Sequence, residues 1–194
     1  MIKRIIIFLL IININAFVEA SIKDEIILNF KKIDNLSFNF KQTIDENTEE
    51  GNCIIQYPKK IYCNYDNFKK KIIVSNGKSL VIKNQASKQY FIYPLDSTPM
   101  ELILNKNYLI EQMQKLDGKI IDDKYFNFSI QNKDNKINIF FDKNSYDLMG
   151  WQTEDIYQNL VITFIYNIEK NKNIDQKFFR LPKWNNFNWY LTFQ

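Results

Sequence analysis

The stretch GNCIIQYPKKIYCNY, residues 51–65, decides the fold, together with IIVSNGKSL at residues 72–80. Two apolar runs flank Pro58, which has no N–H to donate to a β-ladder and therefore suits a turn. A third run enters Asn76-Gly77, a dipeptide favoured in the tight turn between antiparallel strands. The stretch predicts a β-meander, and one face of it carries residues 53, 55, 57, 61, 63 and 65.

The two cysteines of the chain lie in this meander, at equal distances on either side of Pro58. Directly opposed residues of antiparallel strands have Cα atoms about 4.5–5.5 Å apart, which is within the range of a disulfide. We therefore expect a Cys53–Cys63 disulfide, as suits an exported protein. Two free, buried thiols are the alternative, and a bulge at Lys59-Lys60 would produce it by shifting the register.

Residues 1–20 have the features of a cleavable secretory signal peptide. Lys3 and Arg4 precede an apolar run over residues 5–12, and small residues occupy the −3 and −1 positions before Ser21. The run is shorter than the roughly 20 residues that a membrane-spanning helix needs, which makes an uncleaved anchor the weaker alternative. We expect cleavage near Ala20-Ser21 and a soluble, exported mature protein, without a lipid because Ser21 is not a cysteine.

The composition excludes several classes of function. The net charge is +4 with basic and acidic residues interspersed, a pattern that does not predict nucleic-acid binding. The chain has no histidine, so it lacks the usual general base and the commonest metal ligand. A glycine-rich phosphate loop is also missing. We therefore expect a monomer that is not an enzyme and that holds no metal or cofactor.

Apolar spacing along the rest of the chain predicts a sheet with a few helices. Residues 22–33 have helical spacing, and Thr98 and Pro99 suit the N-cap and first position of a second helix. Residues 109–116 are expected to add another helical turn or two, and residues 45–50 to form a charged loop. The predicted strands are 36–42, 52–57, 61–66, 71–75, 79–84, 88–93, 124–131, 136–141, 147–154, 158–167 and a short one at 178–181.

These elements show no βαβ alternation, so they predict one antiparallel sheet, curled or closed, with helices over one face. Residues 21–182 would form this single β domain. The tail, residues 183–194, is crowded with aromatic residues, including Trp184, Trp189 and Phe193. We interpret it as one more strand; the alternative is an exposed aromatic patch for a membrane surface or a partner.

Several short motifs, in their order and spacing, resemble the periplasmic outer-membrane lipoprotein carrier (LolA-type) family. The resemblance covers residues 22–182, nearly all of the expected mature chain. The motifs that carry it are Phe40-Lys41-Gln42, Gly51, Tyr57-Pro58, residues 73–80, Tyr93-Pro94-Leu95, residues 98–104, Leu148-Met149-Gly150-Trp151 and Phe178-Phe179-Arg180-Leu181-Pro182.

The resemblance implies an α+β fold, mainly β: an incomplete antiparallel barrel of about eleven strands with a helical lid. It implies a soluble periplasmic chaperone that shields the acyl chains of lipoproteins. The expected partners are acylated lipoproteins, an inner-membrane ABC-type transporter that releases them, and an outer-membrane acceptor. Ser21 in place of a cysteine favours the soluble carrier over the anchored acceptor. An exported binding or sensor module for another lipid or hydrophobic ligand is the alternative.

The candidate site combines a wall and a lid. A stripe of alternating apolar residues is also typical of a packed core, and one bulge would reverse the parity beyond it. The resemblance favours a hollow interior. The predicted cavity wall is Phe38, Phe40, Ile55, Tyr57, Ile61 and Ile73. The predicted lid residues are Ile26, Phe30, Met100, Ile103 and Leu104.

Tyr57 departs from the family pattern. Many members have an arginine at this position, just before the hairpin proline, and that arginine is thought to hold the lid through backbone carbonyls. A tyrosine offers one donor where arginine offers five. We therefore expect a lid that is held more weakly here or is latched by other residues.

Overall fold

The computed structural model describes residues 21–67, 70–132, 135–154, 158–183 and 188–190, so the proposed signal peptide and most of the tail lie outside the described residues. The helices are α1 (Ile22–Lys31), α2 (Met100–Leu104) and α3 (Lys106–Lys115), with 3₁₀ turns η1 (Leu95–Ser97) and η2 (Gln176–Phe179). The strands are β1 (Asn35–Ile44), β2 (Asn47–Gln56), β3 (Lys60–Tyr65), β4 (Lys71–Asn76), β5 (Ser79–Asn84), β6 (Gln89–Pro94), β7 (Lys119–Ile121), β8 (Tyr125–Asn132), β9 (Asn135–Asp142), β10 (Leu148–Glu154), β11 (Leu160–Lys170) and β12 (Asn188–Tyr190).

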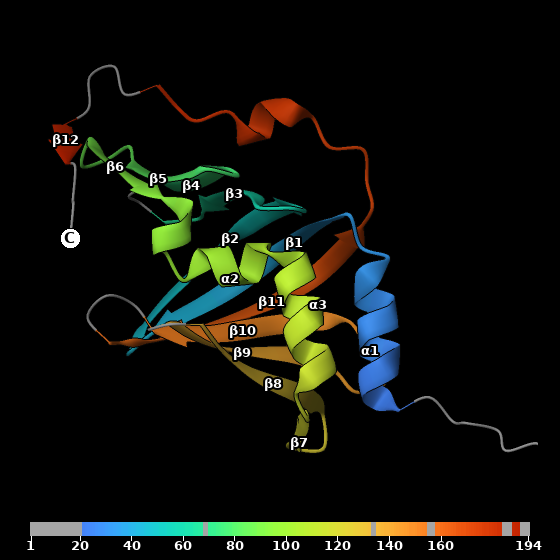
Figure 1. The fold of residues 1–194 in the computed structure, drawn as a ribbon. Coiled ribbons are helices and arrows are strands. Elements are labelled where there is room, and N and C mark those ends of the chain that lie inside the picture. The colour runs from blue at the N-terminus through green and yellow to red at the C-terminus, as the bar shows by residue number, and fades with distance from the viewer. Residues whose placement is uncertain (1–20, 68–69, 133–134, 155–157, 184–187, 191–194) are drawn as a thin grey trace, which may run out of the picture.

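The strands form one sheet in the order β12-β6-β5-β4-β3-β2-β1-β11-β10-β9-β8-β7. Its neighbours are antiparallel, except that β12 runs parallel to β6. The pairing of β1 with β11 joins two meanders that are far apart in the sequence. The sheet curls but does not close, and α1, α2 and α3 lie along its inner side (Figure 1). The prediction of an incomplete antiparallel barrel with a helical lid is confirmed.

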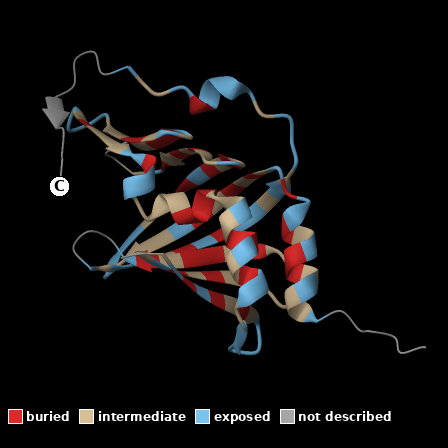
Figure 2. Ribbon diagram, viewed as in Figure 1, coloured by how far each residue is buried: buried red, intermediate tan, exposed pale blue. Residues whose placement is uncertain are grey.

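Alternation along the strands places one apolar face inward. Figure 2 shows buried residues alternating with accessible ones on the strands and recurring along the helices. Helix α1 begins at the predicted position because Ser21 caps it, its hydroxyl accepting from the Asp24 N–H at 3.2 Å. Acidic residues in its first turn and Lys31 in its last suit the helix dipole. The buried side of α1 then carries Ile26, Ile27 and Phe30.

The structure corrects the predicted boundaries at three places. The expected charged loop at 45–50 is a tight turn at Asp45-Glu46, and β2 already begins at Asn47. Asp45 has a φ of 51°, a left-handed conformation that an Asp tolerates well in a turn. Pro99, not Thr98, occupies the N-cap of α2; the Thr98 hydroxyl instead donates to the Leu95 carbonyl at 2.8 Å.

The third correction concerns residues 178–181, which do not form a strand. The segment Gln176–Phe179 is the 3₁₀ helix η2, which lies against the outer face of β3 and β4, opposite α2 (Figure 1). Its cover explains why Val74, which lines the groove beside it, is only 2% exposed although it lies on the outer face. The Tyr90 hydroxyl donates to the Pro182 carbonyl at 3.0 Å and fixes the end of this segment.

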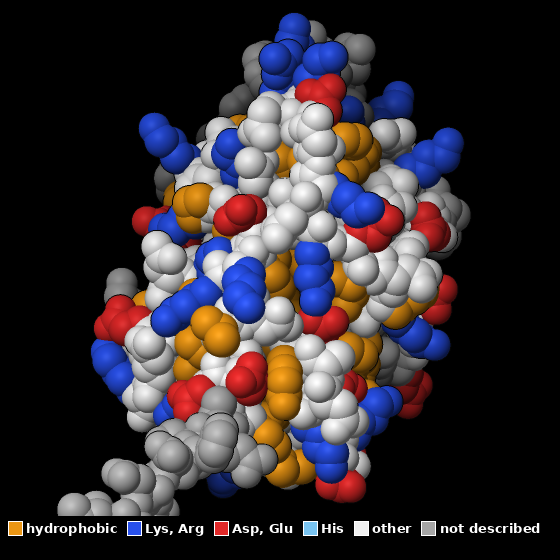
Figure 3. Space-filling view, turned by 90° about the vertical axis from the view of Figure 1, so that its right-hand side faces the viewer, with side chains coloured by type: hydrophobic (Ala, Val, Ile, Leu, Met, Phe, Trp, Pro, Cys, Tyr) orange, Lys and Arg blue, Asp and Glu red, His pale blue; other side chains and the backbone are white. Residues whose placement is uncertain are grey.

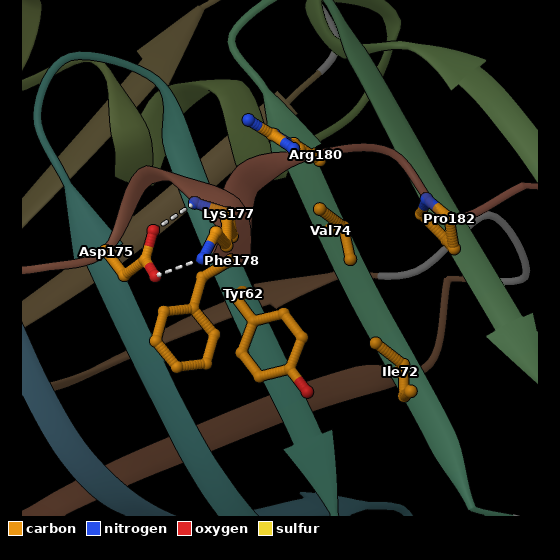
Figure 4. A pocket seen from close by; sticks show the side chains of 8 residues that line it. All are labelled: Tyr62, Ile72, Val74, Asp175, Lys177, Phe178, Arg180 and Pro182. Atoms are coloured by element: carbon orange, nitrogen blue, oxygen red, sulfur yellow. Dashed lines mark hydrogen bonds and ion pairs between the residues drawn. The ribbon is translucent and has the colours of Figure 1, made fainter.

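An open groove of about 370 Å³ lies between this segment and the sheet. In Figure 4 the Phe178 ring lies beside Tyr62 of β3, and the two ring centroids are 5.2 Å apart. Arg180 and Pro182 line the same groove from the C-terminal segment. The groove therefore belongs to the outer face and is separate from the interior beneath the helices.

Candidate hydrophobic-ligand site

The predicted wall residues come together on the inner face. Phe38, Phe40, Ile55, Ile61 and Ile73 are all at most 8% exposed and belong to one apolar cluster. Tyr57 is half-buried and packs against the same cluster. The odd-numbered residues of the stretch 53–65 therefore face the interior, as predicted.

The predicted lid residues lie in the same cluster, opposite the wall. Ile26, Phe30, Ile103 and Leu104 are at most 2% exposed, and Met100 is half-buried against them. Because these side chains pack directly on the inner face, the protein's own side chains fill the interior between lid and wall in this structure, which is not hollow there as the resemblance had implied. A ligand would have to displace lid side chains in order to reach the sheet.

Sequence reasoning missed a large part of the interior. Helix α3 contributes Leu109, Ile110 and Met113 to the cluster, and the second meander contributes a further set of inward residues. The alternation of apolar residues at 126, 128 and 130, and again at 137, 139 and 141, was the available signal. The inward residues of the second meander and β11 are Phe126, Phe128, Ile130, Ile137, Ile139, Phe141, Leu148, Trp151 and Ile165.

Phe30 of α1 connects the lid to both meanders. Its ring meets the Tyr57 ring edge-on at 5.7 Å and the Phe141 ring edge-on at 5.6 Å, as measured between centroids. Such edge-to-face pairs stabilise the packing beyond the area that they bury. Phe30 therefore couples α1 to the first meander and to the second at once.

The predicted disulfide is present. Cys53 and Cys63 are directly opposed in the β2–β3 ladder and bonded to each other, with their Cα atoms 4.1 Å apart. The register is continuous from Gly51↔Tyr65 to Gln56↔Lys60, so the bulge that would have kept the thiols free does not occur. The bond crosses the inner face of the hairpin that ends at Pro58.

Lys59 joins α2 to the hairpin, and Lys106 joins the lid helices α3 and α1 to each other, whereas the Tyr57 phenol makes neither contact. The Lys106 ammonium group at the start of α3 donates to the Ile33 carbonyl at 2.6 Å and the Lys31 carbonyl at 3.1 Å, at the end of α1. At the hairpin tip, the Lys59 N–H donates to the Leu104 carbonyl at 3.0 Å, and its ammonium group pairs with Glu101 at 2.9 Å. These contacts satisfy carbonyls that a helix end leaves without partners.

The Tyr57 phenol takes no part in this fastening. Its oxygen is buried and has no hydrogen-bond partner among the residues that the structure describes. Burial raises the pKa of the Tyr57 phenol above its ordinary value, so the hydroxyl keeps its proton. The expectation that other residues latch the lid in this chain therefore agrees with the contacts of Lys59, and with those of Asn29 on α1, whose amide donates to the Tyr146 carbonyl and the Asp147 carboxylate.

A second buried tyrosine, at the other end of the interior, differs in having a partner. The Tyr65 hydroxyl donates to the Gln42 side chain at 3.2 Å, and the Gln42 amide in turn donates to Thr163 at 3.1 Å. Burial, and secondarily the Glu49 carboxylate, raises the pKa of Tyr65. The Phe40 and Tyr65 rings, 4.8 Å apart, close this end of the interior.

Replacing Lys106 with Met tests the latch. Lys106 lies at the N-terminus of α3, where a positive charge opposes the helix dipole, so removing it should favour α3 itself. We nevertheless expect the free energy of unfolding to fall by about 1–2 kcal/mol, because two carbonyls of the α1 end lose a charged donor. Urea unfolding measures the loss, and amide exchange should become faster at the end of α1.

Lys115→Met is the matched control, because Lys115 is in the same helix and pairs only with the exposed Glu111 among the described residues. Its expected effect is within about 0.5 kcal/mol. Equal effects of the two substitutions would contradict the assignment of a latch to Lys106.

The outer side of the lid is polar. In Figure 3, which looks onto the side that carries α1 and α3, apolar side chains show only as small patches between charged ones. Leu28 of α1, at 51% exposure, is one of the large apolar side chains left accessible. None of the described helices is both long enough and apolar enough to span a lipid bilayer.

The fold and this site define a lidded half-barrel, a curled antiparallel sheet with an apolar interior beneath three helices. The chain belongs to the LolA family, because residues 31–182 match the family described as outer membrane lipoprotein carrier protein LolA. Proteins of this family are periplasmic and bind lipids or other hydrophobic groups, which sets the class of function for this chain.

The chain is similar to solved structures at very low sequence identity. An uncharacterized conserved protein from Thermus thermophilus is 8% identical, with a TM-score of 0.50, covering 84% of this chain and 96% of that one. A LolA superfamily protein from Nitrosomonas europaea is 9% identical, with a TM-score of 0.46 and coverage of 84% and 99%. The first of these likenesses concerns the fold alone, and nothing is inferred from the second. A search of curated proteins found no match to the chain.

Proposed function

We propose that this protein is a periplasmic carrier, without catalytic activity, that takes up the acyl chains of lipoproteins. An ABC-type transporter of the inner membrane would release the lipoprotein, and an acceptor at the outer membrane would receive it. The observation that supports this most is the apolar cluster itself. It runs across the inner face of both meanders into all three helices, while the polar fastenings lie at its margin.

The covered interior matches the energetics of a reversible carrier. Burying a methylene group contributes about 0.8 kcal/mol, so one sixteen-carbon chain contributes on the order of 12 kcal/mol. Several such chains in a permanently open cavity would bind almost irreversibly. Here a ligand must first displace buried side chains such as Phe30 and Leu104, and only the difference in free energy drives loading.

The direct test is extraction of a lipoprotein from inner-membrane vesicles that contain the transporter and ATP. We expect the purified protein to bring the lipoprotein into the soluble fraction as a complex, in an ATP-dependent manner. The control is the same vesicles with a LolA-family carrier of demonstrated activity. Extraction by the control but not by this protein would contradict the proposal. If the protein from the cell envelope instead carries lipids without polypeptide, the ligand is another hydrophobic molecule.

A further inference from the structure

Tyr57 lies at the boundary between the apolar interior and the surface. Ile55, two residues earlier on β2, is completely buried, whereas the next residue, Pro58, is exposed at the hairpin tip. The Tyr57 ring contacts Phe30 on the apolar side, and the Lys106 ammonium group lies 5.6 Å from its centroid. The Tyr57 N–H donates to the Asp34 carbonyl at 2.9 Å, which fixes the backbone at this point.

The hydroxyl at this boundary is a donor without an acceptor. Among the described residues, the other buried side-chain atoms without a hydrogen-bond partner are the amide oxygens of Asn67 and Asn127, which are acceptors. A buried hydroxyl with no partner destabilises the closed protein, and the loss is recovered when an acceptor arrives. The phenol keeps its proton and therefore acts as a donor. Because its oxygen is buried, an uncharged acceptor such as a carbonyl fits better than a charged oxygen, which would have to lose its water there.

We propose that the Tyr57 hydroxyl is a carbonyl-binding subsite, which donates to the ester or amide carbonyl that joins an acyl chain to its polar head. This inference rests on the proposed function, because it needs acyl chains in the interior. The carbonyl of an acyl lipid lies where the apolar chain meets the polar head, and Tyr57 lies at the corresponding boundary of the protein. The ligand then supplies the partner that the closed protein lacks.

The test compares an ester-linked ligand with its ether analogue, which has the same chain but no carbonyl. The probes are a lysophospholipid with a hexadecanoyl ester and the same lysophospholipid with a hexadecyl ether, titrated by calorimetry below their micellar concentrations. We expect the ratio of ester to ether affinity to fall about three- to tenfold in Tyr57→Phe relative to the wild type, which is the strength of one buried hydrogen bond.

Tyr65→Phe is the matched control, because the Tyr65 hydroxyl already has a partner in Gln42. Its ester-to-ether ratio should equal that of the wild type, while its unfolding midpoint falls. The unfolding midpoint of Tyr57→Phe should stay the same or rise, because that substitution removes a hydroxyl with no partner.

The two proposals fail in different ways. Should both ligands bind while Tyr57→Phe leaves the ratio unchanged, the carbonyl subsite is wrong and the carrier function stands. Should neither ligand bind the wild type, although a LolA-family carrier of demonstrated activity binds both, the interior does not accept acyl chains. The carrier proposal then fails, and the subsite falls with it.

Discussion

Phe30→Ala is expected to make the protein less stable and, at the same time, a better binder of acyl chains. Phe30 is 1% exposed and packs on Tyr57 and Phe141. Removing such a buried ring lowers the free energy of unfolding by about 3–5 kcal/mol. The same contacts hold α1 against the sheet, so their loss also favours the open state to which a ligand binds. We expect affinity for a lysophospholipid to rise about tenfold, or about 1.4 kcal/mol.

Phe38→Ala is the control that separates the lid from the wall. Phe38 is 3% exposed, so its removal should lower stability by a similar amount. Its ring pairs with Trp151 on the opposite half of the sheet, with the centroids 6.2 Å apart, whereas the Phe30 ring of α1 pairs with Tyr57 and Phe141. We expect this variant to bind the ligand no better than the wild type. Tighter binding in both variants would show that general loosening, and not lid release, raises the affinity.

The milder substitution Phe30→Leu covers the case in which the alanine variant does not fold. It keeps an apolar side chain at the position but loses the two edge-to-face ring contacts. We expect Phe30→Leu to lose less stability and to gain less affinity than Phe30→Ala. Stability should still fall while affinity rises. Calorimetric titration and urea unfolding of the same preparations measure both quantities. A loss of affinity in both Phe30 variants would contradict the lid interpretation.

Strand parity could be predicted because it depends on the sequence locally. The period of two and the turn at Pro58 were enough to place Cys53, Ile55, Ile61 and Cys63 on one face and to pair the cysteines. A short strand such as β7 (Lys119–Ile121) has too few residues to show a period, and the prediction missed it. The residues at 178–181 resembled a strand, but Asp175 caps a 3₁₀ turn there, its side chain accepting from the Lys177 N–H at 2.9 Å.

The fastening of the lid could not be predicted in the same way. Lys106 and the Ile33 carbonyl are 73 positions apart, and nothing in the local sequence of either indicates that they meet. The orphan hydroxyl of Tyr57 likewise depends on what surrounds it from α1 and α3. Apolar alternation also cannot distinguish a covered interior from a hollow one, because both require the same inward residues.

The second large effect is expected from removing the disulfide. The bond closes a loop with a sequence separation of 10, for which the constraint on the unfolded chain stabilises the folded protein by about 2–3 kcal/mol. We expect the variant Cys53→Ala/Cys63→Ala to lose about this much free energy of unfolding. Both side chains are at most 5% exposed, so part of the loss reflects missing apolar contacts on the inner face.

Reduction of the wild type isolates the cross-link from the side chains. In urea unfolding, a reductant should lower the free energy of unfolding of the wild type by most of this amount. It should leave the free energy of unfolding of the double variant unchanged. The hairpin carries Lys59, whose N–H and ammonium group hold α2 through Leu104 and Glu101. Loosening the hairpin should therefore also speed amide exchange in α2. Unchanged stability on reduction would mean that the paired strands alone, and not the covalent bond, hold the hairpin that supports the lid.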